Sequence, residues 1–301
     1  MKRFSKEAKE NVLLDAPAVC DALGNLFSWG RQELEILGSE EAQVSAEWIL
    51  AETTGLHRSQ IYLEMDRIIP RNLVAKFRLI TGQRKNRIPL AYILGKTFFR
   101  DEVLEVKSGC LIPRPETEIL VEKFIENSGF EKSDSFSFLD LGTGSGAIGI
   151  SVLRHFLKAQ ATFSDGSPRA LRAAKKNVEH YRLSCRVEMM KSDLFSGLGS
   201  LQWDAILCNP PYLAEADWVD VEPEILHEPR EALDGGFDGL YFYREIAKSS
   251  RNYLKEKGWL VLEVGVGQAE TVSSLLEENG FSNIRCFKDH AGIDRVIMAQ
   301  G

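Results

Sequence analysis

The sequence predicts an α/β protein with a small helical domain, a linking β-hairpin and a doubly wound seven-stranded sheet whose last two strands are antiparallel. Two patterns predict this fold class. Up to about residue 85, apolar residues recur at three- and four-residue spacing, the period of amphipathic helices. From about residue 135, short apolar runs alternate with helical patterns, which indicates a mostly parallel sheet. We place the three parts at 1–85, 86–115 and 116–301.

The composition is typical of a globular protein with one large domain or two unequal ones. Its 301 residues are 44% hydrophobic and 27% charged, with a net charge of −7. No apolar run approaches the ~18 residues of a membrane span, and residues 1–7 lack the apolar core of a signal peptide. Five scattered cysteines without a C-x-x-C pair favour a reducing compartment, so we expect a cytoplasmic protein. The five histidines form no paired motif, and we expect no metal site.

Several short helices make up the predicted N-terminal domain. Its apolar pattern begins at Val19, and we expect interruptions at Gly24, Gly30, Gly38, Gly55 and Pro70. Ser39 is expected to open one helix and Ser59 to cap another. No chemical motif lies in this region, so we interpret it as a substrate-recognition domain.

The stretch between Asp66 and Asp101 contains no acidic residue. It carries nine basic ones: Arg67, Arg71, Lys76, Arg78, Arg84, Lys85, Arg87, Lys96 and Arg100. Two interpretations stay open. The positive charges can face a negatively charged partner, or they can lie on a solvated helix face and loop.

The linking segment has alternating and aromatic residues around Gly95 and Arg100, a pattern that predicts a β-hairpin. Phe98 and Phe99 are candidates to cover the open side of a ligand site. A helix is expected to follow, with Glu116 or Thr117 in its first turn. Strands are predicted beyond it at 136–141, 160–164, 185–190, 203–208, 258–264, 281–287 and 293–299.

A glycine-rich loop follows the first of these strands and comprises Gly142, Thr143, Gly144, Ser145 and Gly146. Glycines let the backbone turn sharply there and approach a ligand closely. Asp165 ends the second strand, 21 residues after Gly144. A carboxylate at that place can accept both ribose hydroxyls of an adenosine. Asp193 and Leu194, after the third strand, are placed to contact the adenine.

The residue before the loop helps to distinguish two adenosine cofactors. A dinucleotide site favours G-x-G-x-x-G and seats its pyrophosphate on the helix N-terminus. Here the pattern is G-x-G-x-G, and the negative Asp140 would repel a diphosphate but support an ammonium group. The sequence therefore favours S-adenosylmethionine.

A rigid turn follows the fourth predicted strand and comprises Asn209, Pro210, Pro211 and Tyr212. Its two prolines fix φ, so the carbonyls of Asn209 and Pro210 are held outward. A planar –NH2 group can donate one hydrogen to the Asn209 side-chain oxygen and one to the Pro210 carbonyl, with Tyr212 against its flat face. This arrangement suits alkylation of a planar nitrogen. The plainer alternative is a rigid loop that only ends a strand.

The glycine loop and this turn together resemble class I methyltransferases that act on planar amino groups. The whole chain resembles one family of them, the glutamine methyltransferases of peptide chain release factors (HemK/PrmC). Further matches are Arg87-x-Pro89-x-x-Tyr92-x-x-Gly95, Pro113-Arg114-Pro115-Glu116-Thr117-Glu118, the segment from Glu228 to Arg244 and the segment from Asp289 to Val296. The Arg-Pro-Glu-Thr-Glu stretch favours the release-factor enzymes over their ribosomal-protein-modifying relatives. Gly166 departs from the family pattern, in which a branched apolar residue is usual.

The resemblance implies a Rossmann-like fold and transfer of a methyl group from S-adenosylmethionine to a glutamine. The acceptor is the side-chain amide nitrogen (N5) of the glutamine in the Gly-Gly-Gln motif of release factors. The cofactor-binding residues are then Gly142, Thr143, Gly144, Ser145, Gly146, Asp165, Asp193, Leu194 and Asn209. The substrate-binding residues are Asn209, Pro210, Pro211 and Tyr212, of which Asn209, Pro210 and Tyr212 are the catalytic candidates.

Other functions stay open at this point. The same turn can hold the amino group of adenine in DNA or RNA, although such an enzyme should have a strongly basic face. A non-catalytic protein that binds translation factors and a nicotinamide-dependent redox enzyme are the remaining alternatives. For a release-factor enzyme we expect a monomer with release factors as partners and no stable binding to nucleic acid or membranes.

Some motif residues have more than one explanation. Arg114 and Glu116 either line the cofactor pocket or fix the domain junction. The turn from Asp234 to Leu240, rich in glycine and aspartate, is interpreted as support beneath the Asn209 turn. Glu263 and Asp294 are interpreted as architectural.

Overall fold

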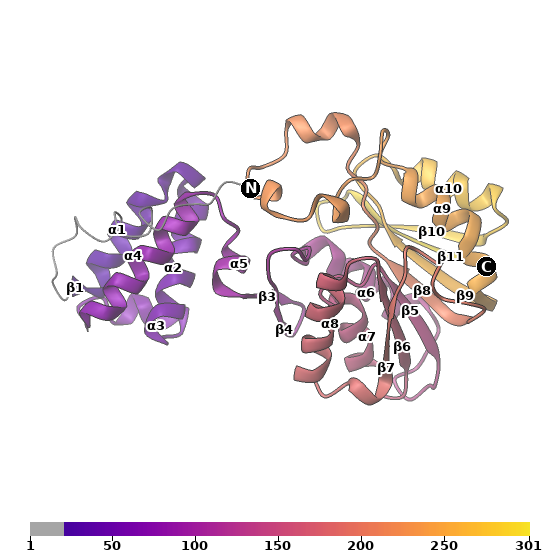
Figure 1. The fold of residues 1–301 in the computed structure, drawn as a ribbon, viewed down its shortest axis with the longest axis horizontal. Coiled ribbons are helices and arrows are strands. Elements are labelled where there is room, and N and C mark those ends of the chain that lie inside the picture. The colour runs from indigo at the N-terminus through magenta and orange to yellow at the C-terminus, as the bar shows by residue number, and fades with distance from the viewer. Residues whose placement is uncertain (1–20) are drawn as a thin grey trace. The chain divides into compact units, whose positions relative to one another are not determined.

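The computed structural model of the chain describes residues 21–301 and divides into two compact units, Met1–Leu94 and Gly95–Gly301 (Figure 1). The predictions that concern residues 1–7, Val19 and Cys20 lie outside the described residues. Each unit has a hydrophobic core of its own.

The N-terminal unit is helical, as the apolar spacing predicts. Its core includes the fully buried Leu26, Ile49 and Phe77, one from each of its three longest helices. The elements are β1 (Asp21–Ala22), α1 (Leu23–Glu33), a 3-10 turn (Glu35–Leu37), α2 (Ser39–Thr54), α3 (Arg58–Leu63), β2 (Ile68–Ile69), α4 (Arg71–Lys85) and α5 (Leu90–Leu94).

Two of the predicted helix breaks are wrong, because Gly24 and Gly30 lie inside α1. A Cβ atom on Gly30 would come within 2.6 Å of the Phe77 ring of α4, so the glycine permits close packing of two helices. Gly38 and Gly55 do bound α2, both with positive φ. Ser59 does not cap α3; His57 precedes that helix, and its ring nitrogen contacts the Ser59 hydroxyl.

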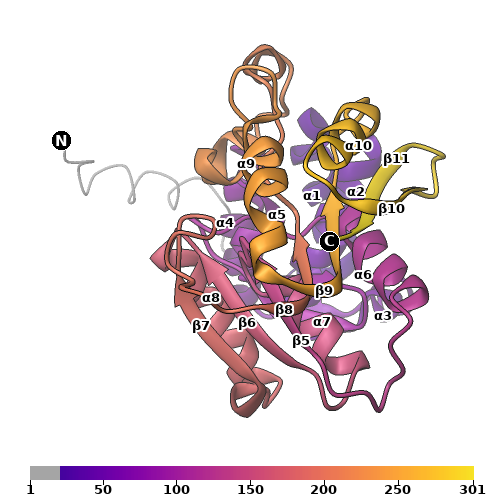
Figure 2. The same ribbon diagram turned by 90° about the vertical axis from the view of Figure 1, so that its right-hand side faces the viewer.

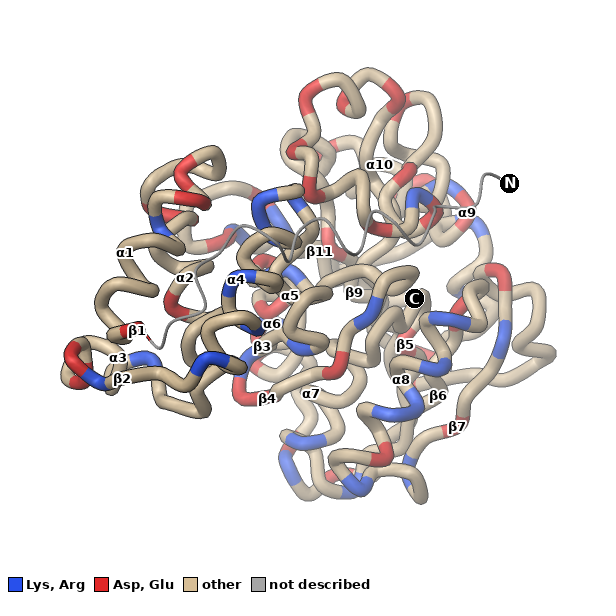
Figure 3. Tube along the Cα trace, turned by 60° about the vertical axis from the view of Figure 1, so that its left-hand side comes forward, with Lys and Arg blue, Asp and Glu red and all other residues tan. Residues whose placement is uncertain are grey.

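Part of the basic stretch is neutralised within the N-terminal unit. Arg84 is buried and pairs with Glu41, and Lys85 pairs with Glu33. The Arg78 guanidinium lies over the Trp29 ring. Both signs of charge occur on this unit (Figure 3). These side chains therefore stabilise the helical unit, whatever else they contact.

The predicted hairpin is present but shorter than the linking segment. Strands β3 (Lys96–Phe99) and β4 (Glu102–Glu105) pair antiparallel, whereas α5 occupies the preceding residues. The hairpin packs on the helix α8 (Pro168–His180): the Glu105 backbone N–H donates to Asn177 Oδ1 at 2.7 Å. Phe99 is fully buried, while Phe98 is half exposed.

The seven-stranded sheet has the order β10-β11-β9-β8-β5-β6-β7, and all seven predicted strands are confirmed within a few residues (Figures 1 and 2). The strands are β5 (Ser137–Leu141), β6 (Gln160–Asp165), β7 (Val187–Lys191), β8 (Trp203–Cys208), β9 (Leu254–Glu263), β10 (Ser282–Lys288) and β11 (Asp294–Gln300). Only β11 runs against its neighbours, and it pairs antiparallel with both β9 and β10. The predicted antiparallel end of the sheet is therefore confirmed.

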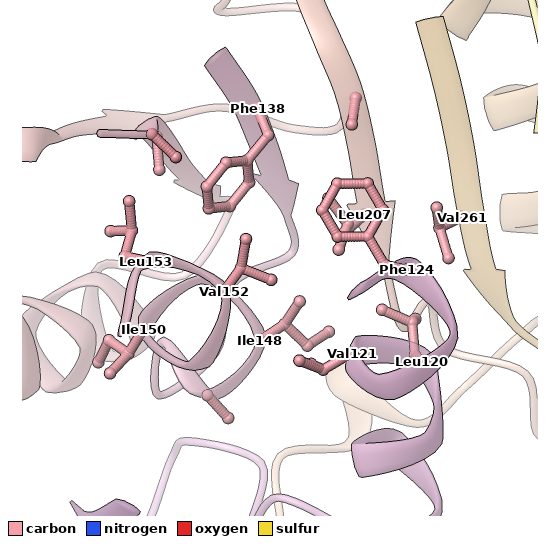
Figure 4. Packing of buried hydrophobic residues seen from close by; sticks show 14 of the residues in the cluster. Leu120, Val121, Phe124, Phe138, Ile148, Ile150, Val152, Leu153, Leu207 and Val261 are labelled. Atoms are coloured by element: carbon pink, nitrogen blue, oxygen red, sulfur yellow. The ribbon is translucent and has the colours of Figure 1, made fainter. Parts of the chain in front are cut away.

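Helices cover both faces of this sheet. One core contains side chains of α6 (Pro115–Asn127), α7 (Ala147–His155) and α8, and in Figure 4 Phe124 of α6 lies beside Leu207 and Val261 of the strands. The other core contains side chains of α9 (Tyr241–Ser250) and α10 (Ala269–Glu278). Short 3-10 turns lie at Ser184–Arg186, Glu215–Val219, Ile225–His227, Arg230–Ala232 and Arg251–Tyr253. Because β5 to β9 are parallel, their carboxyl ends meet at one edge, where ligands bind in such folds.

Candidate active site

A cavity of about 530 Å³ opens at this edge of the sheet. Its size is within the range of about 300–1,000 Å³ that is usual for small-molecule sites. The ends of four strands contribute to it, with the segments 142–145, 165–168, 192–194 and 208–211. The structure thus brings together most of the candidate residues that the sequence places after separate strands.

The glycine loop is bent as the sequence predicts, with positive φ at Gly142, Gly144 and Gly146. The backbone N–H groups of Gly142 and Thr143 both donate to the Ser164 carbonyl at 2.9 Å, which fixes the start of the loop to β6. Gly146 precedes α7 and is not among the residues lining the cavity. A residue that the sequence did not reveal, Asn177, donates to the Ser145 carbonyl at 2.9 Å and supports the loop from behind.

Asp140 faces the protein interior rather than the cavity. Its Oδ2 accepts hydrogen bonds from Thr143 Oγ1 at 2.7 Å and from the Gly149 N–H at 3.0 Å. Burial raises the pKa of its carboxyl to about 7, against the opposing effect of these two donors. Its Oδ1 has no hydrogen-bond partner among the described residues. This geometry does not support the ammonium-binding role expected for Asp140; the side chain braces the loop.

Asp165 has the geometry expected of a ribose-binding residue. Its Oδ2 accepts from the Gly144 N–H at 2.9 Å and its Oδ1 from the Ser167 N–H at 2.8 Å. Burial raises the pKa of this carboxyl, and the two backbone donors oppose that shift. Each oxygen keeps acceptor capacity toward the cavity, so two neighbouring hydroxyls fit here.

The third strand end contributes Asp193 and Leu194 to the cavity wall. Leu194 has a positive φ of 47°, and the Ser192 hydroxyl donates to its carbonyl at 2.6 Å. Asp193 is exposed, and Leu194 is partly buried. A polar rim beside an apolar side chain matches the edge and face of a nucleobase, so the residues present fit an adenosine cofactor.

Asn209 and the two prolines after it line the same cavity. The Asn209 Nδ2 group donates to Thr117 Oγ1 at 3.0 Å, which leaves Oδ1 available as an acceptor. Thr117 lies in the first turn of α6, as predicted, and is 4% exposed. The buried Pro210 follows Asn209 directly. One side-chain acceptor and one backbone carbonyl are therefore held together at this strand end.

Tyr212 lies behind the turn and does not line the cavity. Its carbonyl accepts from Gln268 Nε2 at 3.0 Å, and its side chain packs against the α9–α10 core. Burial raises the pKa of the phenol to about 12, and the nearby Glu263 carboxyl contributes to that shift. Packing of this ring against an acceptor group stays a prediction.

The cavity wall includes two further segments, one before α6 and one around the Glu228-Pro229 motif, whose place the sequence leaves open. Arg114 pairs with Glu228 across the chain, and the Ile112 N–H donates to the other Glu228 oxygen at 2.9 Å. Neither Arg114 nor Glu116 lines the cavity. Arg114 therefore ties two walls together. Both segments stand out as motifs in the sequence, but no local signal reveals a pairing over that separation.

The turn from Asp234 to Leu240 lies against the Asn209 turn. The Gly235 N–H donates to the Leu213 carbonyl at 2.8 Å, and the Leu213 N–H donates to the Leu233 carbonyl at 2.9 Å. Gln268 Nε2 also contacts the Gly239 carbonyl at 3.3 Å. These contacts agree with the interpretation of this segment as structural support.

Other candidates lie away from the cavity. Phe99 belongs to the buried core, so its proposed role as a cover is wrong, whereas Phe98 is not among the lining residues and its role stays a prediction. Within residues 21–301, no three His, Cys, Asp or Glu side chains are grouped closely enough to hold a metal ion. In the same part of the chain, every helix is too short or too polar to cross a membrane.

Two family models match the chain. The one described as "PrmC N-terminal domain" matches residues 25–95, and the one described as "Methyltransferase small domain" matches residues 115–240. The second contains the glycine loop, Asp165, Asp193 and the Asn209 turn.

Curated relatives match over nearly the full chain. The release factor glutamine methyltransferase of Geobacter sulfurreducens is 37% identical over 273 residues, which cover 90% of this chain and 94% of that protein. The protein of the same name from Aquifex aeolicus is 35% identical over 268 residues, with 88% and 94% covered.

Solved structures with the same fold include distant methyltransferases. The hMettl16 catalytic domain in complex with a 3′UTR hairpin aligns with a TM-score of 0.51 and 17% identity, covering 78% of this chain and 84% of that one. A T. Thermophilus 16S rRNA methyltransferase in complex with AdoMet and guanosine aligns with a TM-score of 0.50 and 19% identity, covering 68% and 49%. These two structural similarities show the fold alone.

Proposed function

This chain belongs to the family of release factor glutamine methyltransferases, and from that premise we propose its reaction. It transfers a methyl group from S-adenosylmethionine to the side-chain amide nitrogen (N5) of the glutamine in the Gly-Gly-Gln motif of peptide chain release factors. The observation that carries the proposal is Asn209, whose Oδ1 is left free at the cavity because Nδ2 is bonded to Thr117. A primary amide is the group that such an acceptor and the Pro210 carbonyl can hold by both of its hydrogens.

The cofactor side of the cavity is formed by segment 142–145, Asp165, Asp193 and Leu194. We assign the ribose to Asp165 and the adenine to Asp193 and Leu194. S-adenosylmethionine, when bound, supplies an electrophilic methyl group on a positively charged sulfur. The protein contributes a preformed wall, with the loop backbone held by hydrogen bonds to Ser164 and Asp165, which reduces the cost of ordering on binding.

On the acceptor side, the chain binds and orients the glutamine amide. An amide nitrogen is a weak nucleophile because its lone pair is delocalised into the carbonyl. The Asn209 and Pro210 oxygens hold the two amide hydrogens and stabilise the positive charge that develops on nitrogen during transfer. Once methylated, the nitrogen gives up one of these hydrogens as a proton. Positioning and electrostatics supply the catalytic effect in this proposal.

Mass spectrometry of a purified release factor incubated with this protein and S-adenosylmethionine tests the proposal. A gain of one CH2 mass on the Gly-Gly-Gln glutamine is expected. A release factor whose glutamine is replaced by asparagine serves as the matched control and should stay unmodified. Labelled methyl groups on nucleic acid, with none on the release factor, would contradict the proposal and favour the adenine alternative.

We further propose that the protein acts as a cytoplasmic monomer without stable binding to nucleic acid. In this proposal a recognition domain (1–85) and a linking segment (86–115) precede the catalytic domain (116–301), and the first helps to bind the release factor. The match of a separate family model to residues 25–95 supports a distinct N-terminal domain. Light scattering of the protein, alone and mixed with a release factor, tests the monomer and the complex.

A further inference from the structure

Glu263 is a fully buried carboxyl that lies one strand away from Asn209. The last paired residues of β8 and β9 are Cys208 and Leu262, so the next position on each strand is Asn209 and Glu263. Along each strand these positions share a face with Leu207 and Val261, which belong to the core under α6. Both side chains therefore point to the face that α6 covers.

Thr117 of α6 reaches this same place between them. Its hydroxyl accepts the Asn209 Nδ2–H at 3.0 Å, and it also lies close enough to Glu263 to lower the pKa of that carboxyl. Neither Glu263 oxygen has an aligned hydrogen-bond partner among the described residues. The Thr117 hydroxyl thus lies on the same face as a carboxyl whose two oxygens keep their acceptor capacity. Such contacts often tighten when a substrate binds.

The direction of the Thr117 hydroxyl decides which end of the Asn209 amide faces the cavity. If the hydroxyl donates to Glu263, its lone pairs accept from Nδ2, and Oδ1 faces the substrate. If it donates to Asn209 instead, the amide turns over and its –NH2 group faces the –NH2 group of the incoming glutamine. Two donors facing each other leave both unpaired, which is unfavourable in a closed site.

We propose that Glu263 and Thr117 are positioning residues, which fix the Asn209 amide with Oδ1 toward the acceptor by the directed chain Glu263–Thr117–Asn209. The proposal rests on the proposed function, because it presumes that a primary amide binds at Asn209. In this proposal the Asn209 amide is oriented by the Glu263 carboxyl, which does not line the cavity on either the cofactor side or the substrate side.

The direction of the hydrogen-bond chain Glu263–Thr117–Asn209 is expected to depend on pH. Burial raises the pKa of the Glu263 carboxyl to about 7, against the lowering effects of Thr117 and two arginines. An ionised carboxyl can only accept, which forces Thr117 to donate; a protonated one can donate to Thr117 and release the orientation. The groups around Glu263 on the neighbouring elements are Cys208, Tyr212, Tyr243, Arg114, Glu116 and Arg295.

The first arm of the test compares kcat for release-factor methylation in Thr117→Val, Thr117→Ser and Glu263→Gln. Thr117→Val should lower kcat about 10- to 100-fold, the range for loss of a hydrogen bond in a charged network. Thr117→Ser should restore most of it, and KM for S-adenosylmethionine should change little. The wild-type kcat should rise with pH through about 7, while Glu263→Gln should show a low and flat profile. A kcat of Thr117→Val close to wild type, or failure of Thr117→Ser to restore it, would overturn the proposal.

The second arm needs no substrate and separates this proposal from the proposed function. In protein labelled with ¹⁵N at asparagine, the side-chain amide signal of Asn209 is identified by its loss in Asn209→Ala. It should shift in Thr117→Val and Glu263→Gln and stay in place in Thr117→Ser. An unshifted signal in Thr117→Val overturns the directed chain. If the wild type methylates no release factor, the proposed function fails, and this arm alone decides the arrangement.

Discussion

Each half of the site contains one fully buried acid, and the two differ in what surrounds them. Asp140, under the cofactor loop, accepts two hydrogen bonds on Oδ2, whereas Glu263, under the acceptor turn, has no aligned partner on either oxygen. Burial raises the pKa of each carboxyl to about 7. The acid with two donors on one oxygen holds a loop in one shape, and the acid without an aligned partner keeps capacity to act on a neighbouring side chain. Equal burial therefore does not mean equal function.

The largest expected effect is a fall of stability with rising pH. Because the pKa of both carboxyls is raised, the folded state keeps protons that the unfolded chain loses between about pH 4 and pH 7. This stability is fully present below the unfolded pKa values and is lost as the pH rises through the folded ones. The free energy of unfolding should drop by a few kcal/mol for each acid, on the order that such shifts imply. Urea unfolding at pH 5 and pH 8 measures it.

Two substitutions that each replace one of the buried acids by an uncharged amide measure how much of this pH dependence each acid contributes. Glu263→Gln should flatten part of the pH dependence and stabilise the protein at pH 8, since the Thr117 oxygen lies beside the new amide. Asp140→Asn should flatten another part but lower the stability at pH 5, because its –NH2 group would be buried where Oδ1 has no partner. Stability that increases from pH 5 to pH 8 in the wild type would contradict both assignments.

Asn209→Ala should reduce methyl transfer more than any change on the cofactor side. It removes the side-chain acceptor for one amide hydrogen, and loss of one such group typically costs about 10²- to 10³-fold in kcat. The Kd for S-adenosylmethionine should change far less, because segment 142–145 and Asp165 stay in place. Single-turnover kinetics and calorimetric titration separate the two quantities. Near-full turnover of this variant would refute the role of Asn209.

The two halves also differ in how far the sequence predicts them. Asp140 finds its partners at Thr143 and Gly149, within one short stretch, so the loop that they brace is predictable from local spacing. Asn209 was predicted from its own motif, but its partner Thr117 comes 92 residues earlier. Glu263 joins them only through the register of β8 and β9, which no local pattern reveals. The sequence therefore predicts a side chain that carries chemistry more readily than the side chains that orient it.

Asp165→Asn should weaken cofactor binding without a matching loss of kcat at saturation. The carboxylate would lose its charge, and one backbone donor, Gly144 or Ser167, would face the new –NH2 group. The Kd for S-adenosylmethionine should rise about 10- to 100-fold, the range for hydrogen bonds to a charged group. The matched control is Asp193→Asn, which changes an exposed carboxylate of the same cavity and should have a smaller effect. Equal effects of both variants in a calorimetric titration would argue against Asp165 as the ribose ligand.

The smallest expected effect comes from Thr143→Val, the counterpart of Thr117→Val in the other half. Both threonines are nearly buried, and each hydroxyl lies beside one of the two acids. Thr143→Val removes a donor to Asp140, so it should cost about 1 kcal/mol of unfolding free energy at pH 8 and raise the cofactor Kd a few-fold. Its kcat at saturation should stay near wild type, whereas Thr117→Val should lose kcat at nearly unchanged cofactor affinity. The same pattern for both substitutions in urea unfolding and steady-state kinetics would contradict the distinction between Asp140, which braces a loop, and Glu263, which orients an amide. If the patterns separate, they do so because one hydroxyl serves the shape of a loop and the other the direction of an amide.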